Sequence, residues 1–300
     1  MITRENSVVN DDCLAFLRKT PKKFFSPVLT FLDPPFNQGK EYRETEDDLP
    51  EEQYWKMMGE VCRLVYNRTL DGGSIYFMQR EKNAKLVMET LEKTGWDYQN
   101  LIIWKKKTSA VPQNHKYGLS YQIIAYATKG TSANTFNKLR INPPRLVTEK
   151  YERPNGMYVT DVWDDIRELT SGYFAGDEAM RLENGERFHK QQSPIALLLR
   201  IILSSSNVGD LVFDPFAGTG TTLVVSRQLK RRYVGVEIDP KNAEEINRRL
   251  AIPRTSDNIE KYRKDYIFTE NLNEIWPMKN AQIDSPDFFG KDLKEQKVST

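Results

Sequence analysis

A glycine-rich loop between a strand and a helix constrains the fold of this chain more than any other feature. Residues 211–214 form a short apolar run that predicts a buried strand, and residues 221–229 have the apolar spacing of a helix. Gly218 and Gly220 lie between them, where they allow a tight turn and a close approach of the backbone to a ligand. A further strand and helix follow within residues 233–250. This β-loop-α-β-α order predicts an α/β fold.

The residues around this loop indicate which ligand it binds. A phosphate loop would need a Lys before the helix, and a dinucleotide fingerprint would need a third glycine where Leu223 stands. Glu237 ends the next strand, 17 residues after Gly220, where a carboxylate can accept hydrogen bonds from both ribose hydroxyls. We therefore expect a ligand with a ribose and without a pyrophosphate. A tight turn that binds nothing is the alternative.

A second turn follows the strand predicted over residues 28–32 and has the sequence Asp33-Pro34-Pro35-Phe36. Pro34 has no N–H, so its carbonyl only accepts hydrogen bonds, and the Asp33 carboxylate adds a second acceptor. Two neighbouring acceptors suit an –NH2 group, and the ring of Phe36 suits the stacking of a flat base. Taken alone, the sequence is also typical of a simple turn.

The rest of the chain alternates between helix and strand patterns. We predict helices over 50–70, 83–93 and 195–203, and strands over 74–78, 100–104 and 122–128. Residues 129–187 show little periodicity, and the chain after Pro253 is polar and aperiodic.

Composition excludes several classes of protein. The 300 residues include 44 Lys and Arg and 42 Asp and Glu, so the net charge of +2 excludes a histone-like polybasic protein. Cys13 and Cys62 have no zinc spacing, and we expect no metal site. The longest apolar stretch, 195–203, contains Arg200 and is too short to span a bilayer. With no signal-peptide core at the N-terminus, we expect a soluble intracellular protein without a membrane partner.

The near-neutral total conceals a basic middle of the chain. Residues 101–153 carry ten Lys and Arg against two Glu, a balance of +8, whereas residues 41–60 have a balance of −6. Most such runs are solvated faces, and a phosphate-binding surface is the functional alternative.

Together, the two loops resemble those of the DNA amino-methyltransferases, which use S-adenosyl-L-methionine to methylate N6 of adenine or N4 of cytosine. Because the Asp-Pro-Pro-Phe loop precedes the glycine loop, the chain is similar to the β group of this family, in which the catalytic half comes first. Further matches within residues 7–250 are the segments 10–14, 72–76, 103–106, 161–164, 189–194 and 233–239. Three positions depart from the pattern: Ser193 replaces the usual Lys, Phe36 replaces the commoner Tyr, and Asn10-Asp11 replaces the usual Gly-Asp. The last departure leaves Asp12 as the match for the acid near the adenine of the cofactor.

The resemblance implies a Rossmann-like methyltransferase fold, with a mostly parallel central sheet in circularly permuted order and an irregular target-recognition insertion. It divides the chain into a catalytic half (1–130), a target-recognition region (131–188), a cofactor-binding half (189–252) and a polar C-terminal extension (253–300). The location implied is the cytoplasm of a bacterial or archaeal cell. Double-stranded DNA is the implied partner, and a cognate restriction endonuclease and a homodimer are left open.

The resemblance also implies roles for individual residues. The catalytic set is Asp33, Pro34, Pro35 and Phe36. The set that would bind S-adenosyl-L-methionine is Asp12, Asp214, Phe216, Gly218, Gly220, Thr221 and Glu237. The set that would bind DNA is Lys105, Lys106, Lys107, Arg140, Arg145 and Arg153, of which we expect the three lysines to contact phosphates because a point charge reads bases poorly.

Asp33 and the Pro34 carbonyl would accept both N–H bonds of the target amine and aim its lone pair at the sulfonium methyl group. Asp33 favours adenine, because cytosine-N4 members of the family more often begin this loop with Ser; cytosine-N4 methylation is the alternative. Cytosine-C5 methylation is disfavoured because neither cysteine follows a proline. RNA and protein methyltransferases usually have the reverse motif order, and a non-catalytic relative would have lost Asp33, Gly218 or Glu237.

Overall fold

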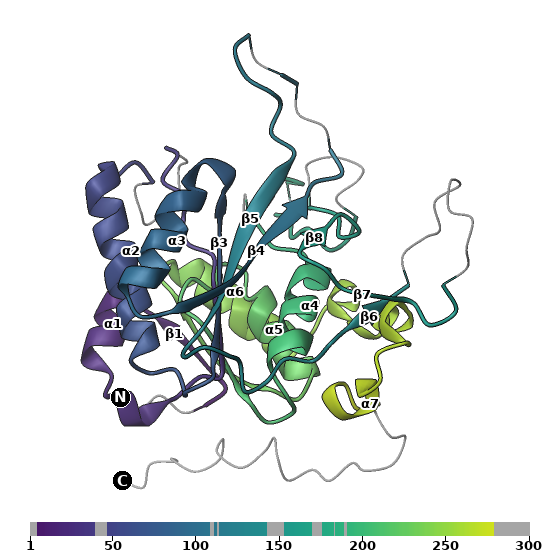
Figure 1. Cartoon of the computed structure of the whole chain (residues 1–300). Helices are drawn as coiled ribbons and strands as arrows, with labels where there is room; N and C mark the ends of the chain where they lie inside the picture. Colours follow the sequence, from purple (N-terminus) through teal and green to yellow (C-terminus); the bar gives the residue numbers. More distant parts are fainter. Residues whose placement is uncertain are drawn as a thin grey trace, which may run out of the picture.

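An eight-stranded sheet forms the centre of the computed structural model (Figure 1). The structure describes residues 5–39, 47–108, 111–112, 114–142, 153–169, 176–182, 184–188 and 191–278. The strand order is β1-β10-β9-β2-β3-β5-β4-β8, and only β5 runs antiparallel to the other strands of this sheet. The predicted α/β fold with a mostly parallel sheet is therefore confirmed.

The strands of the central sheet are β1 (Ser7–Asn10), β2 (Leu29–Leu32), β3 (Ser74–Arg80), β4 (Asp97–Lys105), β5 (Tyr121–Thr128), β8 (Val162–Trp163), β9 (Leu211–Asp214) and β10 (Arg232–Glu237). A separate hairpin pairs β6 (Arg140–Ile141) with β7 (Met157–Tyr158). The α-helices are α1 (Cys13–Lys19), α2 (Glu51–Tyr66), α3 (Ala84–Lys93), α4 (Ile195–Ser205), α5 (Thr221–Gln228), α6 (Pro240–Ala251) and α7 (Leu272–Ile275). Short 3₁₀ turns include η4 (Thr255–Asp257) and η5 (Glu260–Tyr266).

Helices cover both faces of the sheet (Figure 1). Because side chains alternate along a strand, Ile75 and Phe77 of β3 join the apolar cluster of α1, α2 and α3. Tyr76 and Met78 point the other way and join the cluster that contains α4. Burial on both faces explains why the central strands are continuous apolar runs.

The two halves of the chain meet where β2 pairs with β9. The register places Leu29 opposite Val212 and Thr30 opposite Phe213. From β2 the chain continues through α2 to β3 on one side, whereas from β9 it continues through α5 to β10 on the other. Such a reversal leaves a crevice at the carboxyl ends of the two strands, where ligands of open α/β sheets bind. The two predicted loops begin at this crevice.

The region expected to be a separate insertion, 131–188, contributes in part to the central sheet. Val162 and Trp163 form β8, which extends the sheet beyond β4, and Trp163 is buried. The hairpin of β6 and β7 stands apart from that sheet (Figure 1). Arg145 lies outside the described residues.

The segment after Pro253 differs from the polar extension that the sequence predicts. Residues 255–276 form short turns that bury several apolar side chains, among them Ile259, Tyr266 and Trp276. These side chains have no helical spacing because the backbone forms 3₁₀ turns and one short helix rather than a long α-helix. This segment is therefore part of the core.

Trp276 provides a test of that contribution. Its side chain is 1% exposed, and its ring lies 6.4 Å from that of Tyr266. Trp276→Ala should lower the free energy of unfolding by about 3–5 kcal/mol, the usual cost of truncating a buried Trp. Denaturant unfolding measures this loss, and we expect the dependence of the free energy of unfolding on denaturant concentration to stay unchanged. The control Ile252→Ala, at a side chain that is 77% exposed, should change the stability by less than about 0.5 kcal/mol.

Candidate active site

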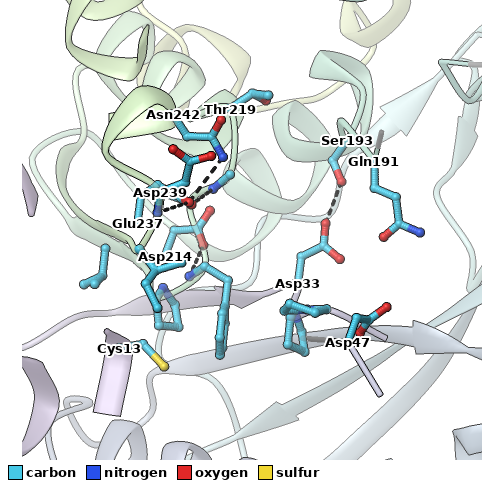
Figure 2. Close-up of a pocket in the computed structure, with 18 of the residues that line it drawn as sticks. Cys13, Asp33, Asp47, Gln191, Ser193, Asp214, Thr219, Glu237, Asp239 and Asn242 are labelled. Atoms are coloured by element: carbon cyan, nitrogen blue, oxygen red, sulfur yellow. Dashed lines mark hydrogen bonds between the residues drawn. The ribbon is translucent and has the colours of Figure 1, made fainter. Parts of the chain in front are cut away.

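A cavity of about 740 Å³ opens at the carboxyl ends of β2, β9 and β10 (Figure 2). Both predicted loops line it. The residues on its wall that the sequence predicts are Asp12, Asp33, Pro34, Pro35, Asp214, Phe216, Gly218, Thr221 and Glu237. The structure thus brings together nine residues from four separate parts of the chain.

Asp33 follows β2 and points into the cavity from the side opposite Glu237 (Figure 2). Its Oδ2 atom accepts a hydrogen bond of 2.9 Å from the hydroxyl of Ser193. Burial raises the pKa of Asp33 to about 8, and the nearby carboxyl of Asp214 adds to the rise, while the Ser193 hydrogen bond opposes it. The Ser193 contact leaves the Oδ1 atom of Asp33 as an acceptor for a ligand.

The Pro34-Pro35 turn is held from behind by buried polar groups. The hydroxyl of Tyr54 on α2 donates to the Pro35 carbonyl at 2.8 Å and accepts a hydrogen bond of 2.9 Å from the Gln79 amide on β3. Burial raises the pKa of Tyr54, so its hydroxyl stays neutral and remains a donor. With the Pro35 carbonyl satisfied, Pro34 and Asp33 provide the acceptors on the cavity wall.

Phe36 is placed differently from the sequence-based expectation. The sequence predicts that its ring faces the cavity and stacks on a base, but the side chain is 2% exposed and belongs to the apolar cluster that contains α4. The bend of the chain comes after this residue, at 37–38, and the ring packs within that cluster instead of lining the cavity. The aromatic residues on the cavity wall are Phe31, Tyr54, Phe188 and Phe216.

Glu237 ends β10 and accepts three hydrogen bonds. The N–H of Gly218 donates to its Oε2 atom at 2.7 Å, and the Asp239 N–H and the Asn242 amide donate to Oε1 at 3.0 and 3.2 Å. Burial raises the pKa of Glu237, and these three donors oppose the rise. A carboxylate oxygen has two acceptor positions, so Oε2, with one donor, keeps a position for a ligand of the cavity that Glu237 lines. The predicted contact with both ribose hydroxyls stays a prediction.

Asp214 ends β9 directly before the glycine loop. Its Oδ1 atom accepts a hydrogen bond of 3.0 Å from the Phe216 N–H, which folds the loop back on the strand. Burial raises the pKa of Asp214 to about 7, opposed by hydrogen bonds from Thr222 and Phe216, and the negative charge of Glu237 contributes to the rise. Because the crevice buries Asp33 and Asp214 together, a bound cation would be stabilised there.

The two glycines of the loop have different tasks. Gly218 lines the cavity with a φ of +54°, a conformation that other residues rarely adopt. Gly220, with a φ of +77°, does not line the cavity; a Cβ there would lie 2.7 Å from the side chain of Ile246 on α6. Its predicted contact with a cofactor is therefore replaced by close packing of α5 on α6. Thr221 begins α5 on the cavity wall.

Asp12 lies on the cavity wall and also caps a helix. Its Oδ1 atom accepts a hydrogen bond of 2.8 Å from the Ala15 N–H at the start of α1. Both readings of this residue, as a cap and as a ligand contact, are thus compatible with its position.

Sequence reasoning missed several residues of the site. Asp47 lines the cavity and holds the chain after Phe36, because its Oδ1 atom accepts the Asn37 N–H at 2.6 Å. The sequence marks Ser193 only as a departure from the family pattern, and Tyr54 only as part of the helix predicted over 50–70. No local signal marks these residues, since their contacts join segments far apart in the chain.

Comparison with known proteins identifies the chain. Residues 28–248 match the family model described as DNA methylase. The chain belongs to this family. The resemblance to β-group DNA amino-methyltransferases is thereby confirmed, as is the prediction of an enzyme.

Two relatives and one solved structure illustrate the match. The methylase is 30% identical to DNA adenine methyltransferase YhdJ of Escherichia coli K12, over 82% of this chain and 83% of the relative. It is 29% identical to the type II methyltransferase M.BamHI of Bacillus amyloliquefaciens, over 94% of this chain but 66% of the relative, just under two thirds. The cytosine-N4-specific PvuII DNA methyltransferase shares the fold, with a TM-score of 0.59 at 16% identity, covering 91% of this chain and 94% of that one. Other solved proteins of this fold hold S-adenosyl-L-methionine.

The lysines predicted to bind DNA lie at the same edge of the methylase sheet as Asp33. Lys105 pairs with Tyr121 at the end of β4, and β3, which runs parallel to β2, ends beside the start of β5. Lys105 and Lys107 are exposed, whereas Lys106 is half-buried and burial lowers its pKa. The backbone here is held by the Glu168 carboxylate, which accepts the Lys107 N–H at 2.8 Å.

The arginines of the predicted DNA-binding set are placed differently. The guanidinium of Arg140 stacks 4.0 Å from the ring of Tyr158 and donates to the Asn155 carbonyl at 2.8 Å. Arg140 is therefore engaged within the β6–β7 hairpin, and its contact with DNA stays a prediction. Arg153 is exposed and contacts Met157 of the same hairpin.

Neither a membrane-spanning helix nor a metal-binding cluster occurs among the residues that the structure describes. Within these ranges no helix is long and apolar enough to cross a membrane. No group of three or more Cys, His, Asp or Glu side chains is arranged there to hold a metal ion.

The raised pKa of Asp33 predicts how stability depends on pH. With a folded-state pKa of about 8, above the ordinary value of 3.8, the folded methylase binds this proton more tightly than the unfolded chain. The stability that the bound proton provides is therefore lost as the pH rises from the ordinary pKa of 3.8 through the folded-state pKa of about 8. Asp33→Asn removes the ionisation, so its melting temperature relative to wild type should rise from about pH 5 to pH 8.5. Thermal unfolding across this pH range measures the two melting temperatures, and Asp48→Asn, at an exposed carboxylate, is the control. If the difference in melting temperature between Asp33→Asn and wild type did not change with pH, the burial of Asp33 would be contradicted.

Proposed function

We propose that this protein transfers a methyl group from S-adenosyl-L-methionine to the N6 amine of an adenine that is rotated out of duplex DNA. One observation carries the proposal: Asp33 and the Pro34 carbonyl line the same cavity as the glycine loop and Glu237. Asp33 and the Pro34 carbonyl suit an amine, and the glycine loop and Glu237 suit a nucleoside. The donor and the acceptor of the methyl group would therefore meet in one cavity.

At the cofactor end, the open position on Glu237 Oε2 would accept a ribose hydroxyl. The Gly218 backbone, Phe216 and Thr221 would surround the methionine part, with Asp214 beneath them. S-adenosyl-L-methionine carries a positive sulfonium, which would favour the ionised forms of Asp33 and Asp214 and offset the cost of burying them.

At the target end, Asp33 Oδ1 and the Pro34 carbonyl would each accept one N–H of the target amine. These hydrogen bonds favour a tetrahedral nitrogen, whose lone pair is then free to attack the methyl group in line with the departing sulfur. Asp33 stabilises the positive charge that develops on nitrogen. The nitrogen–carbon bond forms as the carbon–sulfur bond breaks, which leaves S-adenosyl-L-homocysteine and a positively charged methylated nitrogen. This nitrogen then releases one proton to water to give the neutral methylamine. Phe188, half-buried on the cavity wall, takes the stacking role that the sequence assigned to Phe36.

Adenine is favoured over cytosine because the first residue of the catalytic loop is Asp33, and the relative YhdJ is named an adenine methyltransferase. Cytosine-N4 methylation is the second candidate, since the PvuII enzyme of that specificity has the same fold. We include two further partners in the proposal. A cognate restriction endonuclease is supported by the type II name of M.BamHI, and a homodimer can be tested by sedimentation with and without DNA.

Asp33→Ala should abolish methyl transfer and leave cofactor binding nearly unchanged. The carboxylate acts on the target amine in the transition state, where such a group typically contributes a factor of about 10²–10⁴ in rate. Transfer of labelled methyl groups to duplex DNA, followed by mass spectrometry of the nucleosides, measures both rate and product. Turnover near the wild-type level would refute the role of Asp33, and N4-methylcytosine as the product would establish the second candidate.

Glu237→Gln should weaken the binding of S-adenosyl-L-methionine. A hydrogen bond to a charged group is worth about 1.5–3 kcal/mol, so the dissociation constant should rise about 10- to 150-fold. Calorimetry with purified protein measures this, and Glu244→Gln, at an exposed position of α6, is the matched control. Equal affinities of the Glu237 variant and the control would move the ribose elsewhere in the cavity.

Lys105 and Lys107 should contact DNA phosphates. Each phosphate contact contributes about −0.9 to the slope of log affinity against log salt concentration. The double variant Lys105→Glu/Lys107→Glu should therefore make this slope less steep by the contribution of about two contacts. Lys106 is left unchanged because it is half-buried. Arg232→Glu/Lys93→Glu, at the opposite edge of the sheet, is the control. If both double variants keep the wild-type slope, DNA binds to another face.

A further inference from the structure

A buried ion pair connects the glycine loop to the segment that follows the family match. Arg249, in the last turn of α6, is 1% exposed, and Asp257, at the end of η4, is fully buried. Arg249 donates from Nη2 to Asp257 Oδ1 at 2.8 Å and from Nε to Oδ2 at 3.2 Å. The third nitrogen of its guanidinium, Nη1, donates to the Thr219 carbonyl in the glycine loop.

Thr219 lies between Gly218 and Gly220, which both have a positive φ. On the cavity side, the loop is held by the Gly218 N–H bond to Glu237. The Arg249 contact holds the same loop from its other side. Because a guanidinium donates in a fixed planar geometry, its two bonds to Asp257 determine where the third nitrogen lies.

Asp257 compensates the positive charge of the buried Arg249, since an unpaired buried charge is strongly destabilising. Burial alone would raise the pKa of Asp257, but hydrogen bonds from Arg254 and Arg249 outweigh it and bring the pKa down to about 2. The carboxylate is therefore ionised throughout the physiological range. Arg254 donates to it from Nη2 at 2.7 Å and from Nε at 3.1 Å.

The network continues to the catalytic side of the cavity. Arg254 Nη2 also donates to the Glu178 carbonyl at 3.1 Å, and the Glu178 carboxylate accepts the Ile195 N–H at 2.6 Å. Ile195 begins α4, two residues after the Ser193 that donates to Asp33. Polar contacts thus lead from the glycine loop to the helix start that carries the hydroxyl partner of Asp33.

We propose that Arg249 and Asp257 are positioning residues that hold the glycine loop in its ligand-binding conformation, which makes the segment 254–257 part of the cofactor site. The name of the ligand rests on the function proposed above. The effect on the loop does not, because the Thr219 contact exists whatever ligand the cavity takes. The family match ends at residue 248, so both positioning residues lie outside it.

Arg249→Lys tests the proposal, because Lys keeps the charge near Asp257 but cannot bond the carboxylate and the Thr219 carbonyl with a planar fork. The KM for S-adenosyl-L-methionine should rise about tenfold, while kcat at saturating cofactor and the KM for DNA stay within about twofold. A merely structural role would lower the melting temperature and the active fraction and leave the KM for the cofactor unchanged. Arg248→Lys is the matched control, since the neighbouring side chain is 73% exposed and pairs with Glu245.

A second readout does not depend on the cofactor. Amide hydrogen exchange of residues 218–222, measured without ligand, should be faster in Arg249→Lys than in wild type and the Arg248→Lys control. If wild type binds no S-adenosyl-L-methionine, the proposed function fails, yet faster exchange still supports the positioning role. Unchanged exchange together with an unchanged KM would overturn it.

Arg254→Gln covers the case in which Arg249→Lys does not fold. The Arg254 side chain is 28% exposed, so its loss leaves the buried pair intact and removes the bonds that orient Asp257 from the other side. A rise of about threefold in the KM for the cofactor, with faster exchange of the loop, supports the proposal. Wild-type values for both quantities would count against it.

Discussion

The pairing of β2 with β9 is the interaction on which the site depends. These strands belong to opposite ends of the chain, and their register brings Asp33 and Asp214 to the same edge of the sheet. The connections from the two strands lead in opposite directions, so the crevice between the loops is not covered by a crossover. A family that splits its sequence into two halves in permuted order can thus keep one active site, because strand adjacency rather than chain order defines it.

That adjacency has an electrostatic cost. Burial raises the pKa of Asp33 to about 8 and that of Asp214 to about 7, and neither forms an ion pair with a Lys or Arg within the described residues. The site is therefore less stable when it is ready to act than when it is protonated. In the function proposed above, a cationic cofactor beside these two carboxylates would offset this cost on binding, and a product with a neutral sulfur would not. Stability and function oppose each other at these two positions.

Support for the site comes from residues that touch no ligand. Tyr54 and Gln79 hold the proline turn, Ser193 orients Asp33, and the Arg249–Asp257 pair holds the glycine loop. Each contact joins segments that are distant in the chain or belong to different elements. The segment after Pro253 belongs to this support and to the core at once, because Asp257 anchors it beside the loop and Trp276 packs beneath the sheet.

The sequence by itself determined the α/β class, most helices and strands to within a few residues, and the two loops that carry chemistry. These features are local: apolar periodicity, proline and glycine positions, and an acid at a strand end. Only the tertiary structure decided which side chains face the cavity. Phe36 is buried in the apolar cluster that contains α4, Gly220 is required by the packing of Ile246, and Arg140 is engaged by Tyr158. The polar segment after residue 253 joined the core for the same reason: burial depends on what the fold places against a residue, and that partner is not encoded in the spacing of its neighbours.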